Sequence, residues 1–431
     1  MNKKVDKYDS TGIKSGMDGG MERTSLRERT FVSFKNPVYR LYYGGLLLQW
    51  FPMNMQMMTR SLLIYRLTGS AAILGAITFA HAIPTLLLSL YGGVIADRMQ
   101  KKYIMIVGQV ASAVVSLGIA LSLSMGYLSV EHIGSWWILV VASMLQGIIM
   151  GLMMPSRQAM LPEIVSGEQL MNAVSLTTMG ANALRLFAPA LAGFLIAAFD
   201  FEAVYYVMTA SFLLSGVCVA FIPTTRMTTT RVSNVLEDIK GGLHYIRHDT
   251  TILLILVFTL LIVVLSMPYM HLMAIFADDI LKVGEIGLGW LMSVSGIGAI
   301  VGSTALASLP NKKRGAMLLI SAVIMGVALA SFSFSNSFYL SLALMVIVGL
   351  GQTGRMTLGN TLLQYYVTDE YRGRVMSIYM MEFGLASFAT FTAGLLAEVV
   401  GIQWAVGGFA MVLALLSILA LAFIPRLRKL D

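Results

Sequence analysis

Forty consecutive residues, 315–354, contain no Asp, Glu, Lys or Arg, and few folds can accommodate such a run. A helix needs about 20 apolar residues to cross the roughly 30 Å hydrocarbon core of a bilayer. The run is therefore long enough for two crossings, with a turn near residues 334–338. Charged residues form only 12% of the chain, against about 25% in soluble domains. The sequence predicts an all-α membrane protein.

The distribution of apolar runs predicts twelve transmembrane helices. Their expected bounds are about residues 39–65, 71–96, 103–126, 136–155, 172–198, 202–223, 251–276, 286–309, 315–334, 337–362, 375–398 and 402–425. The corresponding domains are a disordered cytoplasmic tail, a six-helix bundle, a cytoplasmic linker, a second six-helix bundle and a short cytoplasmic tail, at residues 1–34, 35–223, 224–250, 251–425 and 426–431.

Lysine and arginine predict the orientation, because the cytoplasmic loops of membrane proteins carry an excess of both. Basic residues gather in the N-terminal tail, in the linker and in alternate loops, for example at Arg98 and Lys312. The other loops are mostly acidic and include Asp278 and Glu285. We therefore expect a multi-pass protein of the cell inner (plasma) membrane with both termini in the cytoplasm. The net charge of +8 then reflects topology and contact with anionic lipid, and nucleic acid is rejected as a partner.

The chain also contains an internal repeat. IVSGEQLMNAVSL at residues 164–176 aligns with YVTDEYRGRVMSI at residues 366–378, so that Glu168 corresponds to Glu370 and Ser175 to Ser377. Each segment lies between the fourth and fifth predicted span of its own half. Two six-helix halves related by a parallel repeat are typical of transporters whose binding site lies between the halves, near the middle of the bilayer.

Several motifs resemble the major facilitator superfamily. GGVIADRMQKK (92–102) resembles the loop signature between its second and third spans. NTLLQYYVTDEYRGRVMSIY (360–379), AGLLAEVVG (393–401), YRLTGSAAILG (65–75) and RLFAPALAG (185–193) resemble its twelve-span drug:proton antiporter branch, which includes macrolide efflux pumps and the enterobactin exporter. The resemblance covers nearly the whole chain. It implies the major facilitator fold, proton-coupled export and a monomer.

The loop signature implies a conformational gate, with its positions occupied by Gly93, Asp97, Arg98, Lys101 and Lys102. An aspartate at the C-terminal end of a helix faces the negative end of that helix's own dipole, so Asp97 needs a positive partner. Span eleven begins on the same side, after Arg372 and Arg374, and its N-terminus offers unpaired N–H groups. We expect Asp97 to bind there when the cytoplasmic side is closed. The alternative is a permanent contact that only fixes the loop.

Ionisable groups inside the spans are candidates for proton coupling, because a charge inside the bilayer is costly and usually functional. Glu382 in span eleven lies at a depth similar to that of Arg355 in span ten, which predicts a pair between them. A permanent structural ion pair is the alternative. His81 in span two is a further candidate proton carrier, with a packing histidine as the alternative. His271 is expected at the outer interface.

Polar residues within the spans are candidates for lining a substrate cavity: Gln49, Asn54, Gln56, Arg60, Asn182, Arg185 and Gln352. Gln49, Gln56 and Arg60 share one helical face by their spacing. An arginine near the end of a span can instead extend its charge to the membrane surface, which is the alternative for Arg60. The 31 methionines would suit a site for varied ligands, although packing against other helices and lipid is the alternative.

No motif for catalysis, ATP or metal occurs in the chain: we find no Gly-x-x-x-x-Gly-Lys-Ser/Thr loop, no Gly-x-Ser-x-Gly elbow and no cluster of metal ligands. The sequence therefore predicts a secondary transporter, not an enzyme, without cofactors, that exports amphipathic drug-like or siderophore-like molecules in exchange for protons. Three deep arginines against one deep glutamate favour an acidic or polyphenolic substrate. The alternatives are a lipid or lysolipid flippase, a nutrient importer and a non-transporting receptor or scaffold.

Overall fold

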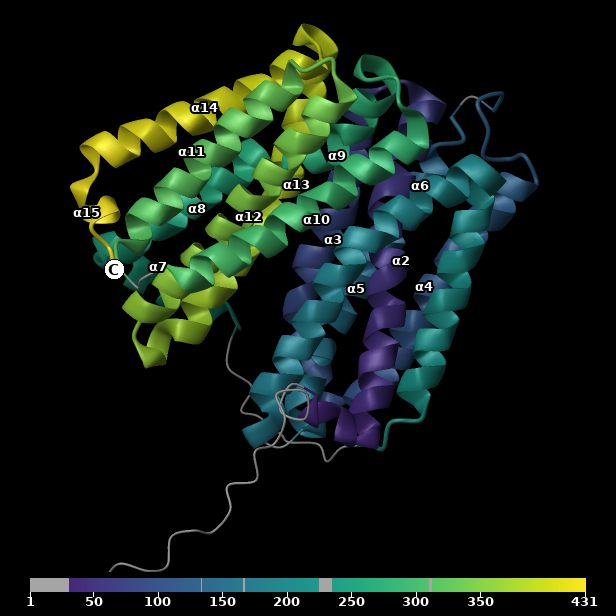
Figure 1. The fold of residues 1–431 in the computed structure, drawn as a ribbon. Helices are drawn as coiled ribbons and strands as arrows, with labels where there is room; N and C mark the ends of the chain where they lie inside the picture. The colour runs from purple at the N-terminus through teal and green to yellow at the C-terminus, as the bar shows by residue number, and fades with distance from the viewer. Residues whose placement is uncertain (1–30, 133, 166, 225–234, 310–311) are drawn as a thin grey trace, which may run out of the picture.

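The computed structural model describes residues 31–132, 134–165, 167–224, 235–309 and 312–431, and this part of the chain is helical nearly throughout (Figure 1). In chain order the elements are η1 (Val32–Lys35), α2 (Pro37–Thr68), α3 (Ala71–Arg98), α4 (Lys101–Ser124), α5 (Trp137–Ile164), α6 (Gly167–Ala220), α7 (Val235–His248), α8 (Thr250–Ser266), α9 (Pro268–Ile275), η2 (Phe276–Ile280), α10 (Gly284–Ser308), α11 (Arg314–Ser333), α12 (Phe338–Tyr366), α13 (Asp369–Val400), α14 (Ile402–Phe423) and α15 (Pro425–Arg428).

Ten helical segments of the described chain are long and apolar enough to cross a membrane. α6 is counted once among them, although its backbone leaves the helical conformation at Asp200 (φ 66°, ψ 177°). α2 is 32 residues long but is not among the ten, and it contains Arg60 and Arg66. The predicted turn near residues 334–338 is confirmed, because α11 ends at Ser333 and α12 begins at Phe338.

The helices pack as two groups that are consecutive in the sequence. In the N-terminal group, α2 packs on α6, α3 on α5, and α4 on both α5 and α6. In the C-terminal group, α10 and α11 pack on α12, while α14 packs on α11 and α13. The groups meet where α3 contacts α13, α6 contacts α10 and α2 contacts α9. In Figure 1 they converge toward the top of the view, where α2 ends, and diverge toward the bottom.

Glycine allows the closest approaches between helices. A methyl group at Gly349 of α12 would lie 1.9 Å from the carbonyl oxygen of Ser295 in α10, within the C-terminal group. A methyl group at Gly193 of α6 would lie 2.4 Å from the carbonyl oxygen of Glu285 in α10, across the two groups. Both distances are far below van der Waals contact, so the backbones can touch at these points only without a side chain.

One helix lies in the segment predicted as a linker. α7 packs on the start of α13 and on α8. The ring of Tyr245 stacks on that of Tyr371 at a centroid distance of 4.3 Å, and Ile246 is buried. The part of the linker that the structure describes is therefore attached to the C-terminal group.

Candidate functional site

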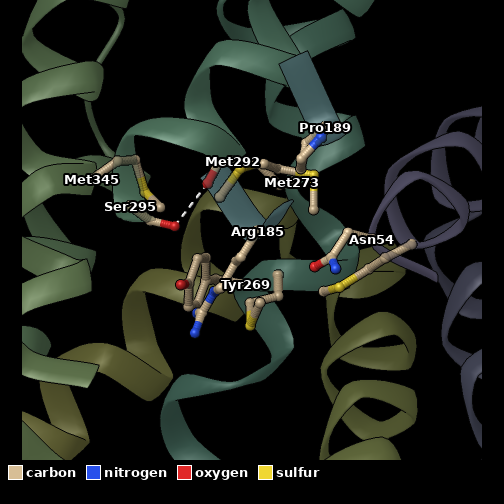
Figure 2. Close-up of a pocket in the computed structure, with 10 residues that line it drawn as sticks. Asn54, Arg185, Pro189, Tyr269, Met273, Met292, Ser295 and Met345 are labelled. Atoms are coloured by element: carbon tan, nitrogen blue, oxygen red, sulfur yellow. Dashed lines mark hydrogen bonds between the residues drawn. The ribbon is translucent and has the colours of Figure 1, made fainter. Parts of the chain in front are cut away.

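A small cavity lies between the two helix groups (Figure 2). Its volume is about 40 Å³, which is room for a few water molecules. Five helices line it, and half of the lining side chains are methionines. The lining residues are Asn54, Met57, Arg185, Pro189, Tyr269, Met270, Met273, Met292, Ser295 and Met345.

Arg185 is the charged residue of this cavity, and it joins the two groups. Its Nη2 donates a hydrogen bond of 2.6 Å to Oε1 of Gln352, from α6 to α12. Tyr269 of α9 lies beside it (Figure 2) and is close enough to interact with it electrostatically. Within the described chain, Arg185 has no carboxylate within ion-pair distance, and the buried hydroxyl of Tyr269 has no hydrogen-bond partner. A positive charge and a free hydroxyl suit an acidic ligand.

A buried carboxyl group lies in the C-terminal group. Glu382 of α13 is 4% exposed, and its Oε1 accepts a hydrogen bond of 2.6 Å from the hydroxyl of Thr259 in α8. Its other oxygen has no hydrogen-bond partner among the described residues. Arg355 of α12 is fully buried and interacts electrostatically with Glu382 and with Tyr379. The predicted association of Glu382 with Arg355 is therefore present as an electrostatic contact.

The cavity and this carboxyl group are linked through α12. Gln352, which binds Arg185, precedes Arg355 by three residues, so the two side chains lie on one face of the helix. The path from the cavity to Glu382 thus runs through Arg185, Gln352 and Arg355.

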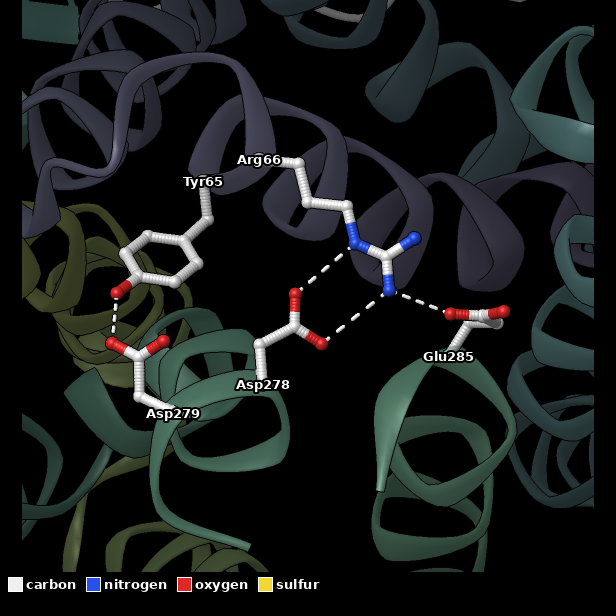
Figure 3. A network of polar contacts seen from close by, with 5 residues as sticks. All are labelled: Tyr65, Arg66, Asp278, Asp279 and Glu285. Atoms are coloured by element: carbon white, nitrogen blue, oxygen red, sulfur yellow. Dashed lines mark hydrogen bonds and ion pairs between the residues drawn. The ribbon is translucent and has the colours of Figure 1, made fainter. Parts of the chain in front are cut away.

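A network of polar contacts closes the end of the molecule at which α2 finishes (Figure 3). Nε of Arg66 lies 3.1 Å from Oδ2 of Asp278, and its Nη2 lies 2.6 Å from Oε2 of Glu285. The hydroxyl of the preceding Tyr65 donates to Asp279. These contacts join α2 to η2 and α10, across the two groups. Sequence analysis placed the acids on the outer side but missed their pairing with Arg66, which lies just after the first predicted span.

A further contact strengthens the same end. Glu398 of α13 accepts hydrogen bonds of 2.6 Å from the hydroxyl of Ser70 and of 3.1 Å from the backbone N–H of Ala72, at the start of α3. A carboxylate at the first turn of a helix is electrostatically favourable. The outer ends of α3 and α13 are thereby held together.

The predicted cytoplasmic gate is only partly visible. The side chain of Asp97, and the surroundings of Gly93, lie outside the described residues. Lys101 pairs with Glu163 at 2.6 Å, from α4 to α5, so this contact is inside the N-terminal group. Arg98 is exposed, and Lys102 is partly buried.

The gate residues of α13 have local contacts. Arg372 pairs with Asp369 at 2.6 Å, one turn earlier in the same helix. The guanidinium of Arg374 lies over the ring of Tyr371, 5.4 Å from its centroid, and its side chain packs on Gly242 of α7. The contact between Asp97 and the start of α13 stays a prediction.

The other predicted cavity residues face several directions. Asn54 lines the cavity, and its Nδ2 donates to the carbonyl of Trp50 at 2.8 Å. Gln49 is fully buried, with its Nε2 3.6 Å from the sulfur of Met153 in α5, and Gln56 is buried as well. Asn182 of α6 is exposed. The face of α2 that carries Gln49 therefore packs on α5, not on this cavity.

Arg60 and His81 meet at α5. Nη1 of Arg60 donates to the hydroxyl of Ser143 at 3.3 Å, and Nδ1 of His81 lies 3.1 Å from the carbonyl oxygen of the same serine. His271, predicted at the outer interface, is instead half-buried with a fully buried Nδ1, and interacts electrostatically with Arg60 and His81. The prediction for His271 is wrong, because α9 turns this side chain toward the N-terminal group.

Comparison with known proteins identifies the family. The profile of the family described as "Transmembrane secretion effector" matches residues 28–431. The chain belongs to this family. Its relatives are transporters of the major facilitator superfamily, as the loop signature predicted. The family and the fold indicate a membrane transporter.

Individual relatives agree with this assignment. The chain is 26% identical over 343 residues to the staphyloferrin A transporter of Staphylococcus aureus, covering 77% of this chain and 83% of that protein. It is 24% identical to the enterobactin exporter EntS of Citrobacter koseri, covering 88% of both chains. The predicted resemblance to macrolide efflux pumps is confirmed by macrolide efflux protein A of Streptococcus pyogenes, which is 20% identical over 72% of this chain and 77% of that protein.

Solved structures confirm the fold. The nucleoside transporter NupG superposes with a TM-score of 0.72, covering 88% of this chain and 99% of that one, at 13% sequence identity. Members of this family and the solved transporters thus share the helical architecture despite low identity.

Proposed function

We propose that this protein is a secondary transporter that exports acidic, amphipathic, siderophore-like molecules by alternating access, in exchange for protons. The observation that carries the proposal is Arg185, a charge without an acidic partner in the described chain, placed between the helix groups in a cavity rich in methionine. The names of two relatives, a staphyloferrin A transporter and an enterobactin exporter, support this substrate class.

The proposed topology has twelve spans in two halves of six. α2 and the division of α6 at Asp200 would add two spans to the ten candidate segments. Each helix group then contributes six spans, and the even number places both termini on one side. The distribution of basic residues supports a cytoplasmic location for that side, in the inner (plasma) membrane.

The cavity is too small for the proposed substrate in this conformation. Sites for small molecules measure roughly 300–1,000 Å³, whereas this one measures about 40 Å³. Binding therefore requires the groups to move apart, as alternating access does. The Arg66 network, Tyr65, Arg66, Asp278, Asp279 and Glu285, would hold the outer side closed during that step.

Glu382 is the proposed proton carrier. It is buried, one of its oxygens is free of hydrogen bonds in the part of the chain described, and Arg355 lies between it and the cavity. A bound acidic substrate would neutralise Arg185, which also interacts electrostatically with Arg355. Substrate charge and the proton on Glu382 would then influence each other through α12.

Drug efflux is the second candidate function. Five of the ten residues that line the cavity are methionines, whose flexible and polarisable side chains suit apolar ligands of varied shape. The match to a macrolide efflux protein supports this candidate as well. It differs from the first in having no need of Arg185.

A ligand-stability screen on the purified protein in detergent tests the proposal. Catecholates, macrolides, lipophilic cations and lysolipids are compared by unfolding temperature, since a ligand at 100 times its dissociation constant stabilises a protein by about 2.7 kcal/mol. We expect catecholates to stabilise the native protein and the Arg185→Gln variant to lose this effect. The matched control is Arg247→Gln, at an exposed arginine of α7. Stabilisation by macrolides or cations that persists in Arg185→Gln would contradict an acidic substrate.

A further inference from the structure

A second set of polar side chains lies outward of the central cavity. Arg60 follows the cavity-lining Met57 by three residues, about 4.5 Å along α2. It is half-buried, and it is close enough for electrostatic interaction with three further side chains, Tyr205, His81 and His271. We call these four residues the Arg60 cluster.

The Arg60 cluster is assembled from both helix groups. Arg60, His81 and Tyr205 belong to α2, α3 and α6 of the N-terminal group, and His271 belongs to α9 of the C-terminal group. α9 packs directly on α2 and α3. Any movement of one group against the other therefore changes the distance between His271 and the other three side chains.

The charge of Arg60 lacks a counter-ion. A guanidinium carries a permanent positive charge and five N–H donors. Across the described residues, the one hydrogen bond of Arg60 goes to the hydroxyl of Ser143 at 3.3 Å, and no carboxylate lies within ion-pair distance. A charge placed among apolar helices is costly unless it is paired. Most of the donors of Arg60 are thus left for an anion.

Two neighbouring groups also lack partners. Tyr205 is fully buried, and its hydroxyl has no hydrogen-bond partner in the described chain. The same holds for the buried Nδ1 of His271. Buried polar atoms are nearly always paired, so two unpaired atoms beside an unpaired charge indicate a ligand that all three would bind.

His81 is oriented for the same role. A carbonyl oxygen can only accept, so the contact of 3.1 Å between Nδ1 of His81 and the carbonyl of Ser143 places a hydrogen on Nδ1. The other ring nitrogen, Nε2, is then left to interact within the cluster. Ser143 thereby fixes both Arg60 and His81 from behind.

We propose that the Arg60 cluster is a binding site for an acidic group, either a carboxylate of the transported molecule or a small inorganic anion. It lies between the central cavity and the outer Arg66 network, on the route that an exported substrate would follow. The carboxylate as a source rests on the proposed function, whereas the anion site itself does not. An anion there would bridge the two helix groups.

Anion titrations of the purified full-length protein test this site. Unfolding temperature is measured in a buffer whose anion is isethionate, to which chloride or citrate is added at constant ionic strength. We expect a saturable rise in the native protein. Arg60→Gln should weaken the apparent affinity at least about tenfold and Tyr205→Phe about threefold, as expected for loss of a charged and of a neutral hydrogen bond. Arg185→Gln should leave the chloride effect unchanged.

Each outcome bears on the proposal. Saturation by chloride alone supports an inorganic anion, and saturation by both probes supports an acidic group of the substrate. The absence of a saturable effect in the native protein, or an equal effect in Arg60→Gln, overturns the site. If Arg60→Gln does not fold, Tyr205→Phe decides, because it removes one hydroxyl and leaves the packing intact. Loss of catecholate binding in Arg185→Gln with an unchanged chloride response separates this site from the proposed function.

Discussion

Arg66 at the end of α2 and Glu285 in the first turn of α10 form an ion pair of 2.6 Å across the two helix groups. The same guanidinium also pairs with Asp278. The side chains of Arg66 and Glu285 are 36% and 24% exposed, so solvent screens the pair and exposed pairs of this kind contribute about 0.2–1 kcal/mol each. That is strong enough to bias two conformations and weak enough to break in every transport cycle.

Loss of Arg66 should open the outer side. Removal of about 1 kcal/mol from the closed state raises the outward-open population roughly fivefold. Met57 lines the central cavity, and Cys218 is the one cysteine of the chain. In a Cys218→Ser background, we expect Arg66→Gln to increase the labelling rate of Met57→Cys by an impermeant maleimide from outside by about this factor.

Lys282 provides the matched control for this measurement. It is an exposed basic residue of the same outer segment, next to the network but outside the printed ion pairs of Arg66. Lys282→Gln should leave the labelling rate unchanged. An equal rate in Arg66→Gln and in the native background would show that the Arg66 network does not hold the outer side closed.

Asp97→Asn should act in the opposite direction. If Asp97 binds the start of α13 when the cytoplasmic side is closed, its neutralisation destabilises the outward-open state by roughly 1 kcal/mol. Labelling of Met57→Cys from outside should then slow about fivefold, and the double variant with Arg66→Gln should return toward the native rate. Faster labelling in Asp97→Asn would argue against the predicted gate.

Much of the architecture could be predicted because a bilayer imposes a length on every apolar run. The uncharged run of residues 315–354 sets the ends of α11 and α12 to within a few residues. Charges inside the spans were equally informative about the site. Arg185 and Gln352, chosen as polar residues within apolar helices, are joined by one hydrogen bond although they are 167 positions apart in the chain.

The direction in which each side chain faces could not be predicted in the same way. A helix among other helices and lipid is apolar all around, so periodicity does not identify its inner face. For this reason Tyr269 and His271 in α9 were not recognised as facing the N-terminal group. Pairs that depend on the packing of distant ends, such as Arg66 with Glu285, were missed for the same reason.

Gly349→Ala should destabilise the C-terminal group. The added methyl would lie 1.9 Å from the carbonyl oxygen of Ser295, so α10 and α12 must separate, at a cost of about 1–3 kcal/mol. A lower unfolding temperature in detergent is expected. Gly44→Ala in α2 is the control, because nothing lies within 4 Å of the added atom and alanine favours a helix over glycine by about 1 kcal/mol. Equal effects of the two substitutions would contradict this packing.

Glu382→Gln should separate binding from proton exchange. The glutamine keeps an oxygen to accept the hydrogen bond of 2.6 Å from Thr259, so the local packing is preserved while the titratable group is lost. In proteoliposomes with a pH-sensitive dye inside, proton movement driven by a catecholate should fall to background, and the affinity for that ligand should change less than about threefold, because the carboxyl group does not line the cavity. Glu131→Gln, at an exposed glutamate, should leave proton movement intact. Proton movement at the native rate in Glu382→Gln would assign the coupling to another group.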